Sequence, residues 1–321
     1  MKSNLVIKGI LIGILYIGIS IPVSAQSVYS IENLGDPTVY NDFVVGPGKV
    51  QLDMKPGETK TTLITLTNRL GSTKTFTIGT EDIRGSNDPA QTVVLLGSDR
   101  GPYSLKDYIK VASSTVVLNH SERVSIPVTI SVPADAQPGG LYGSVILTTG
   151  TSASADSPNT ARNPIITRIG TLFFIRVAGD VKADGELTKF SLKNDSVLLG
   201  STKSIDFRLL FENKGTVHLN PYGLLTVKNV FGATVGKIEV EPWFALPASL
   251  RLREVTWNPS FLFGRYVATA EINRGYNDVI DTQTISFWVI PWKIIAIVFI
   301  GLMLIIGLFK WIFSKFSFVR K

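Results

Sequence analysis

Residues Val124–Val132, VSIPVTISV, carry the most regular pattern in the chain. Apolar side chains occupy every second position, and Ser, Pro or Thr stands at each position between them. Because successive side chains of a strand point to opposite faces, the pattern predicts a β-strand with one buried and one wet face. Proline has no N–H to donate to a sheet, so Pro127 predicts that this strand lies at a sheet edge or beside a bulge.

Short alternating runs of the same kind fill the chain on both sides of this strand. Clusters of Pro, Gly, Asn and Asp separate them, which is typical of an antiparallel all-β protein. The predicted strands are 43–54, 61–67, 74–83, 92–96, 124–132, 141–149 and 164–178 in the first half, and 204–213, 224–230, 237–240, 250–257, 264–272 and 279–289 in the second. The predicted fold class is all-β: two tandem immunoglobulin-like β-sandwich domains, at 43–179 and 180–290, followed by one transmembrane helix.

A weak internal repeat supports two related domains. In each half a predicted strand ends at an asparagine before a glycine turn, and a later strand begins with the sequence Gly-x-Tyr. Immunoglobulin-like sandwiches often carry a corner tyrosine whose hydroxyl holds a crossing loop, so we expect a structural role in preference to a functional one. The predicted structural residues are Asn68, Gly140 and Tyr142 in the first domain and Asn213, Gly264 and Tyr266 in the second.

The C-terminal run Ile294–Phe309, IIAIVFIGLMLIIGLF, predicts a membrane anchor. Such a run rises about 24 Å as a helix, and flanking Lys stems and Trp rings extend it across a hydrocarbon core of ~30 Å. We expect the transmembrane helix at 291–312 and a short basic cytoplasmic tail at 313–321, because no acidic residue follows Asp281. A buried core helix is the alternative. The predicted anchor residues are Trp292, Lys293, Lys310 and Trp311.

The first 25 residues predict a signal peptide. Two lysines accompany an apolar stretch that ends in Val23-Ser24-Ala25, the small-x-small form that a signal peptidase cuts. An uncleaved N-terminal anchor is the alternative. Residues 26–42 are polar without a sustained period, so we expect a leader segment there. With cleavage, the protein is a single-pass cell-membrane protein whose N-terminal domains are extracytoplasmic.

The net charge of +7 reflects membrane topology more than the exported part. Of 32 Lys and Arg residues, two lie in the signal peptide and five flank or follow the anchor, which leaves 25 against 25 Asp and Glu. A near-neutral exterior gives no electrostatic basis for nucleic-acid binding. The chain has no cysteine, so disulfides and thiolate metal sites are excluded.

Catalytic patterns are also missing from the sequence. His120 and His218 are the only histidines, no Gly-x-Ser-x-Gly elbow or phosphate-binding Gly-rich loop occurs, and we expect both histidines at the surface. Residues 84–107 contain Asp88, Asp99 and Asp107, but their spacing matches no EF-hand, so a structural or solvated loop is favoured over an ion site. We therefore expect no enzyme, no cofactor and no metal site.

Several phrases resemble a known family of bacterial surface proteins. They are PGKVQLDMKPGETKTTLITLTN and VPADAQPGGLYGSVIL in the first domain, and FENKGTVHLNPYG, VKNVFG, LPASLR and FGRY in the second. Over residues 43–290 and the anchor, the chain is similar to the membrane-anchored proteins of domain of unknown function 916 (DUF916), which are related to WxL-interacting proteins. The resemblance implies two immunoglobulin-like domains, the first associated with peptidoglycan and the second with another protein or a host surface.

Two non-catalytic functions follow. In the first, the tandem domains form a membrane-anchored cell-surface protein that binds cell-wall polymer, other surface proteins or both. In the second, the protein is a tethered chaperone or assembly factor that offers a sheet edge to an exported client strand, or an accessory subunit of an envelope membrane complex. Pro127 argues against strand addition along its own strand, because proline blocks pairing.

Overall fold

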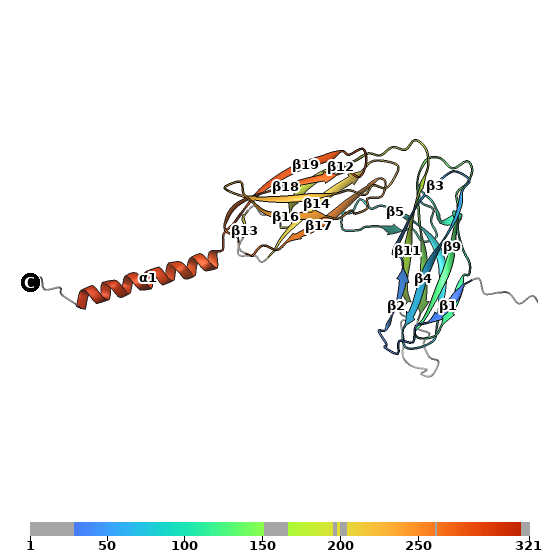
Figure 1. Cartoon of the computed structure of the whole chain (residues 1–321), viewed down its shortest axis with the longest axis horizontal. Coiled ribbons are helices and arrows are strands. Elements are labelled where there is room, and N and C mark those ends of the chain that lie inside the picture. Colours follow the sequence, from blue (N-terminus) through green and yellow to red (C-terminus); the bar gives the residue numbers. More distant parts are fainter. Residues whose placement is uncertain (1–28, 151–165, 195–197, 200–203, 261, 316–321) are drawn as a thin grey trace, which may run out of the picture.

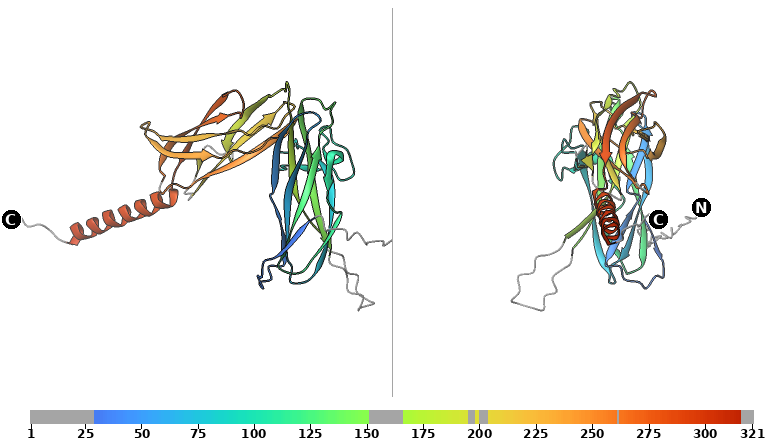
Figure 2. Two further views of the ribbon diagram at one scale, coloured as in Figure 1. Left: turned by 45° about the vertical axis from the view of Figure 1, so that its right-hand side comes forward. Right: turned by 90° about the vertical axis from the view of Figure 1, so that its left-hand side faces the viewer.

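Two β-sandwiches and one long helix make up the protein, as the computed structural model shows (Figure 1). The structure describes residues 29–150, 166–194, 198–199, 204–260 and 262–315. The long axes of the two domains meet in an L, and α1 leaves the far end of the second domain (Figure 2). The predicted fold class, tandem immunoglobulin-like sandwiches with one C-terminal apolar helix, is confirmed. The predicted signal peptide, 1–25, lies outside the described residues.

The first sheet of the first domain is built on β9 (Glu122–Ser131). Its strand order is β1-β9-β4-β2, and β7 also pairs with β9. These partners are β1 (Ser30–Asn33), β2 (Asp42–Gly46), β4 (Thr59–Arg69) and β7 (Ile109–Val111). The alternation of the sequence is confirmed: Val124, Ile126, Val128 and Ile130 are fully buried in the core between the sheets.

The predicted edge position of the Pro127 strand is wrong. β4 pairs with β9 along one side, while β1 and β7 share the other side. β1 faces residues 122–125 and β7 faces residues 128–130, so Pro127 lies in the gap between these two short partners. Its carbonyl there accepts a hydrogen bond from the Ala112 N–H at 3.2 Å. The missing N–H falls where no ladder bond is needed, which lets proline occupy an inner strand.

The second sheet of the first domain has the order β3-β11-β10-β5-β6, with β8 also paired to β5. Its strands are β3 (Lys49–Met54), β5 (Lys74–Arg84), β6 (Val94–Leu95), β8 (Thr115–Leu118), β10 (Gly139–Gly150) and β11 (Ile166–Val177). A short 3-10 helix, η1 (Lys106–Tyr108), lies before β7. β3 runs parallel to β11, and the other pairs in this sheet are antiparallel.

Two expectations near the start of this domain need correction. The run 43–54 is not one strand: it divides into β2 and β3, which belong to different sheets, around the cis peptide bond Gly46–Pro47. The segment 26–42, expected to be a leader, contains β1. All four side chains of β1 are exposed, so its pairing with β9 leaves no apolar period in the sequence.

The second domain has sheets of order β12-β14-β17 and β13-β19-β18-β15-β16. Its strands are β12 (Gly185–Leu192), β13 (Leu198–Leu199), β14 (Ile205–Asn213), β15 (Tyr222–Asn229), β16 (Thr234–Val240), β17 (Ser249–Trp257), β18 (Gly264–Asn273) and β19 (Ile280–Val289). In β14 the side chains alternate between buried and half-buried along its whole length, which matches the predicted inward face of that strand. Trp243, Trp257, Phe207, Phe211 and Phe287 contribute large rings to this core.

The helix α1 (Trp292–Lys315) begins after a connection of only two residues, Ile290 and Pro291. Within it Ile295–Ser314 has a mean hydropathy of 2.6, and none of that window is buried against the protein. Such a helix is long and apolar enough to cross a membrane. Trp292 and Trp311 are exposed near its two ends, and Lys310 lies beside Trp311. Lys293 begins its first turn, and the helix continues beyond the predicted end at residue 312.

Candidate binding site at the junction of the two domains

The two domains meet on the outer face of the β3-β11-β10-β5 sheet. In β11, Phe173, Ile175 and Val177 point into the core of the first domain, so Phe174 between them points outward. In an isolated first domain, the rings on this outer face, those of Tyr142 and Phe174, would be exposed to water. Here they form a separate apolar cluster with residues of the second domain, which we call the junction. Its buried residues are Ile83, Tyr142, Phe174 and Leu246, and Val93, Tyr103, Leu172 and Phe244 pack around them.

Aromatic edges and hydrogen bonds fix the two domains against each other. Phe174 packs at ring-centroid distances of 5.4 Å from Tyr142 and 4.9 Å from Phe244, both edge-to-face. The bonds that cross are His218 N–H to the Tyr142 hydroxyl at 2.6 Å, Gly140 N–H to the Thr216 carbonyl at 3.0 Å, and Leu250 N–H to the Ser86 carbonyl at 3.0 Å. These three hydrogen bonds and the aromatic contacts favour one arrangement of the two domains.

His218 lies inside the junction, and its predicted surface position is therefore wrong. Only 7% of the residue is exposed, and its ring lies 5.2 Å from Phe174 and 5.7 Å from Tyr142. Burial, followed by the nearby charges of Lys49 and Arg176, lowers the pKa of His218 to about 4. The imidazole is neutral at pH 7. The Tyr142 hydroxyl lies 3.2 Å from His218 Nδ1, within hydrogen-bonding distance, and accepts a hydrogen bond from the backbone N–H of His218.

The two tyrosines predicted as equivalent corners behave differently. Tyr266 stays within its own domain, where its hydroxyl accepts from Phe263 N–H at 3.0 Å and donates to the Phe263 carbonyl at 3.2 Å. Tyr142 holds a loop of the other domain instead. Burial raises the pKa of the Tyr142 hydroxyl, so it stays protonated. The first tyrosine connects two domains, and the second closes a local turn.

Gly140 makes room for Tyr142. A Cβ at residue 140 would stand 1.9 Å from the tyrosine hydroxyl, so no other residue fits while that ring is in place. The backbone of Gly140 is not in the left-handed region, so this glycine is required by the space that Tyr142 occupies, whereas its neighbour Gly139 does have a positive φ. Gly264 has a φ of +100°, which L side chains rarely adopt.

Asn68 and Asn213 occupy matching places and make matching bonds. Both are fully buried at the ends of β4 and β14. In each, the side-chain amide donates to two backbone carbonyls, one four residues ahead and one on a distant segment, and its oxygen accepts from an N–H two residues ahead. The acceptors are Ser72 and Leu118 for Asn68 and Val217 and Ala245 for Asn213; the donors are Leu70 and Gly215.

A cationic surface lies at one side of the junction. Lys49 Nζ is 5.5 Å from the ring centre of Phe174 and 5.3 Å from that of Phe244, and the Arg251 guanidinium lies 5.5 Å from the latter ring. Burial lowers the pKa of Lys49. We name Lys49, Arg176 and Arg251 the cationic flank. Within the described part of the chain none of the three forms an ion pair or a side-chain hydrogen bond, and Arg251 Nε is buried without a partner.

The acidic segment 84–107 is organised by a residue just before it. Asp82 is fully buried, and its carboxylate accepts backbone N–H bonds from Gly101 at 3.0 Å and from Leu105 and Lys106 at 2.9 Å. Burial alone would raise the Asp82 pKa, but the hydrogen bonds outweigh it and lower it. Asp107 pairs with Arg100. Among the described residues no group of three or more His, Cys, Asp or Glu side chains is placed to hold a metal.

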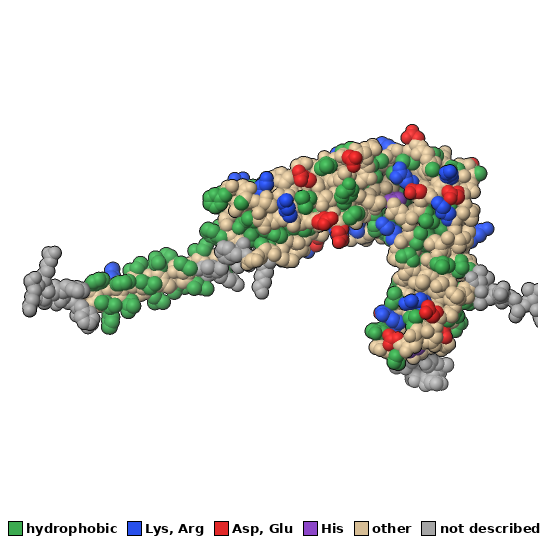
Figure 3. Space-filling model, viewed as in Figure 1, with side chains coloured by type: hydrophobic (Ala, Val, Ile, Leu, Met, Phe, Trp, Pro, Cys, Tyr) green, Lys and Arg blue, Asp and Glu red, His purple; other side chains and the backbone are tan. Residues whose placement is uncertain are grey.

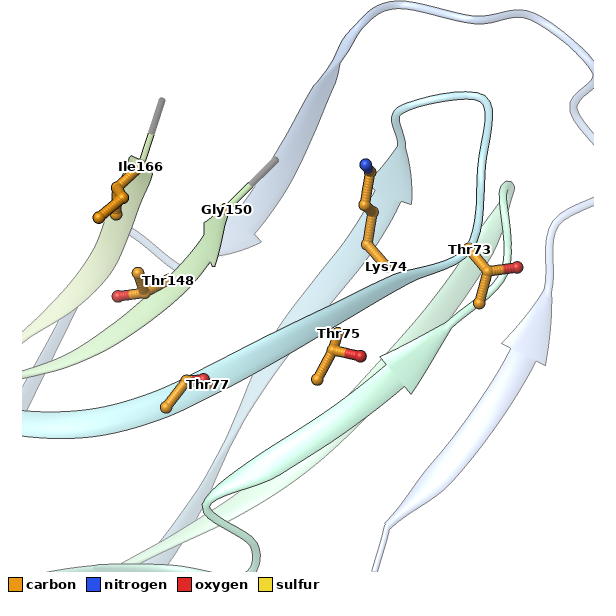
Figure 4. A pocket seen from close by; sticks show the side chains of 7 residues that line it. All are labelled: Thr73, Lys74, Thr75, Thr77, Thr148, Gly150 and Ile166. Atoms are coloured by element: carbon orange, nitrogen blue, oxygen red, sulfur yellow. The ribbon is translucent and has the colours of Figure 1, made fainter. Parts of the chain in front are cut away.

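The two larger hollows among the described residues both lie outside the cationic flank. The larger, of about 620 Å³, is lined by Thr73, by threonines of β5 and β10, and by Lys74 and Ile166 (Figure 4). It carries hydroxyls and methyls but only one titratable side chain, and it borders residues outside the described part of the chain. The other, of about 410 Å³, lies beside the junction between Tyr103, Tyr108, Pro138 and Thr216. Each of these hollows is lined by fewer charged side chains than the three that form the cationic flank.

Sequence reasoning missed most of the junction. A usable signal was present in β11, where LFFIRV places Phe174 beside Phe173 and breaks the alternation of a strand with one wet face. A strand that is apolar on both faces has a second partner, which here is the other domain. Lys49 and Arg251 carry no such signal, because each stands at an ordinary polar position of a strand.

Comparisons with known proteins find similar solved structures but no similar sequence. No protein-family model matches the chain, and no curated protein matches it significantly. Among solved structures it is similar to a chain of the chaperone–tip adhesin complex of CFA/I fimbriae biogenesis, at 13% identity and a TM-score of 0.35, covering 78% of this chain and 99% of that one. It is also similar to the class 5 fimbriae chaperone CfaA, at 11% identity and a TM-score of 0.35, covering 78% of this chain and 100% of that one.

A third similar structure is the CsuC–CsuE pre-assembly complex of Acinetobacter baumannii, with 11% identity, a TM-score of 0.34, and 78% and 99% coverage. These likenesses concern the fold alone. The chain's own sheet topology defines a protein of the tandem immunoglobulin-like class, with a C-terminal helix long and apolar enough to cross a membrane.

Proposed function

We propose that the protein is a non-catalytic, single-pass membrane protein whose extracytoplasmic domains bind another protein of the cell surface at the cationic flank. The candidate span, the basic residues after it and the near-neutral exterior support this topology. We also propose membership of the DUF916 and WxL-interacting type, on the phrases quoted above, with peptidoglycan as a further ligand. The absence of a catalytic cluster in the sequence supports a function by contact alone.

The observation that carries the proposal is a set of cations held in place without partners. Lys49 and Arg251 stack against Phe244, which restricts their side chains before any ligand arrives. The partly desolvated ammonium of Lys49 gains most from a carboxylate, because a charge-assisted hydrogen bond strengthens as water is excluded. Phe244, which is only partly buried, supplies apolar surface for the rest of the ligand. An acidic peptide segment with neighbouring apolar side chains has the complementary chemistry.

Site-specific photo-cross-linking in intact cells tests this proposal. Gln51 is exposed on β3, on the same face as Lys49, so a photoreactive residue placed there reports what approaches the flank. We expect adducts to acidic segments of one or a few surface proteins, lost in Lys49→Glu and kept in the matched control Lys110→Glu on β7. Adducts to wall fragments would move the assignment to wall polymer, and adducts that survive Lys49→Glu would overturn the flank as the site.

One observation favours the assembly-factor alternative. β3 pairs only with β11 among the described strands, so its other edge is open, and Lys49 stands at its beginning. An extended client segment could add to this edge while its carboxylate meets the flank. The same cross-linker separates the two functions: adducts that appear only on newly exported chains and disappear on chase indicate assembly, whereas adducts that persist indicate a stable surface complex.

A further inference from the structure

The end of the second domain from which α1 leaves carries the most exposed apolar side chains of that domain. Pairing of Gly264 with Val289 and of Asn229 with Tyr266 brings the β15–β16 hairpin tip, the start of β18 and the end of β19 to this end. Hydrophobic side chains gather there beside the start of the helix (Figure 3). The exposed residues are Val230 and Phe231 on the hairpin tip, Phe263 before β18, and Trp288 on β19, with Phe231 90% exposed.

An exposed aromatic tip of this kind is unusual for a water-facing turn. The hairpin turn itself is well formed, since Gly232 N–H donates to the Asn229 carbonyl at 2.9 Å and the Asn229 side chain accepts from Phe231 N–H at 3.0 Å. Phe231 is therefore displayed on a rigid turn, with no role in the core of its own domain. Rigid display of an aromatic residue suits insertion into another apolar phase.

On the sheet that carries the hairpin tip, the charged side chains at this end are basic, whereas the opposite sheet contributes Asp206, which accepts a hydrogen bond from Thr256. Lys228 and Arg265 are exposed on the outer face of the same sheet, and Arg265 pairs in register with Trp288. No Asp or Glu occurs within residues 227–238, within 255–270, or after Asp281. Basic side chains next to exposed aromatic ones match a bilayer surface, where aromatics lie at the headgroup level and cations meet anionic lipids.

We propose that the hairpin tip and its neighbours, Val230, Phe231, Phe263 and Trp288, lie in the headgroup layer of the bilayer that α1 crosses, as a second membrane contact that prefers anionic lipid. The inference rests on the membrane anchor of the proposed function and not on any ligand of the flank. Only Ile290 and Pro291 separate β19 from the helix, so the tip has no long tether that would hold it away from the lipid. Two contacts fix the tilt of the second domain.

Depth-dependent fluorescence quenching tests the contact on the full chain in nanodiscs of phosphatidylglycerol and phosphatidylcholine. The protein has no native cysteine, so single cysteines can carry an environment-sensitive dye. The probe is Phe231→Cys. Leu63→Cys, exposed on β4 of the first domain, is the matched water-facing control, and Gly301→Cys in the middle of α1 reports insertion of the helix. Spin-labelled lipids with shallow or deep nitroxides are the quenchers.

We expect the dye at residue 231 to shift to shorter wavelength and lose emission with shallow nitroxides, and the dye at residue 63 to do neither. A dye at 231 that behaves like the one at 63, while the one at 301 is quenched by deep nitroxides, overturns the inference and leaves the anchor intact. An unquenched dye at 301 overturns the anchor and the inference together. Arg265→Glu should weaken quenching at 231 in anionic discs, and the control Lys110→Glu should not.

Discussion

The two domains share a sandwich but use the same corner in different ways. Asn68 and Asn213 make the same set of bonds at the ends of β4 and β14, which shows how closely the frameworks agree. Tyr142 and Tyr266 follow glycines at matching strand starts, yet one bonds to the other domain and the other to Phe263. A tyrosine at this position closes a loop when the loop is in its own domain, as Tyr266 does, and it links two domains when the loop belongs to the next domain, as Tyr142 does.

The largest effect is expected from the asparagines, where the domains are alike. Asn213→Ala leaves two buried carbonyls and one N–H without partners, and Asn68→Ala leaves one buried carbonyl, one part-buried carbonyl and one N–H; each should lower the free energy of unfolding by about 3–4 kcal/mol. Hydrogen exchange of the full chain measures this by domain. Asn68→Ala should raise exchange mainly in β4, β8 and β9, and Asn213→Ala in β14 and β17. Equal loss in both domains from either variant would contradict their independence.

Acid should weaken the junction through His218. The His218 pKa is about 4 in the folded protein against an ordinary value of 6.5, so the unfolded chain binds more protons between these values. The stabilisation is present above pH 6.5, falls as the pH is lowered, and is fully lost below about pH 4. The total is roughly 3 kcal/mol. Thermal unfolding as a function of pH measures it.

His218→Asn is the control for this pH dependence, because an amide does not titrate in the range. That variant should keep the slopes due to carboxylates and lose the part between pH 4 and 6.5. If His218→Asn left the pH dependence of thermal unfolding unchanged, His218 would be accessible to water in the folded state, and the junction would be looser than the structure shows.

Removing the hydroxyl of Tyr142 should loosen the contact between the two domains, whereas removing that of Tyr266 should loosen only a turn of the second domain. Tyr142→Phe leaves the His218 N–H without its acceptor in a buried place, and it should cost about 2 kcal/mol and widen the distribution of interdomain distances. Tyr266→Phe should cost a similar or smaller amount and leave those distances unchanged. Pairs of spin labels, one in each domain, measure them. A broadened distribution in Tyr266→Phe would remove this distinction between the two tyrosines.

The smallest effect is expected at the exposed pair Arg100–Asp107 in the acidic loop. Both side chains are about half exposed, so water screens the pair, and Asp107→Ala should change the free energy of unfolding by less than about 1 kcal/mol. Urea unfolding gives the value. Asp82→Asn offers the contrast within the same loop, because its buried carboxylate holds three N–H groups and its loss should release residues 99–108.

Alternation predicted most strands because burial on one face writes a period of two into the sequence. The strands that were missed are β1, β7, β8, β12 and β13. Four of them are two to four residues long, too short for a period to show. β12 has eight residues, but a register shift between Leu187 and Lys189 interrupts its alternation. The position of Pro127 depended on where β1 and β7 end, which its own strand does not encode. His218 looked like a surface residue because its cover comes from Tyr142 and Phe174, in the other domain.

The two-residue connection between β19 and α1 has a mechanical consequence. With α1 held in a membrane, a force that pulls the two β-sandwich domains away from it passes from the helix directly into β19. The ten residues of β19 are paired with β18 along their whole length. A load along the strand strains all these hydrogen bonds together, whereas a load across it would open them one at a time. β19 would therefore take the tension first, along the direction in which its hydrogen bonds to β18 resist separation best.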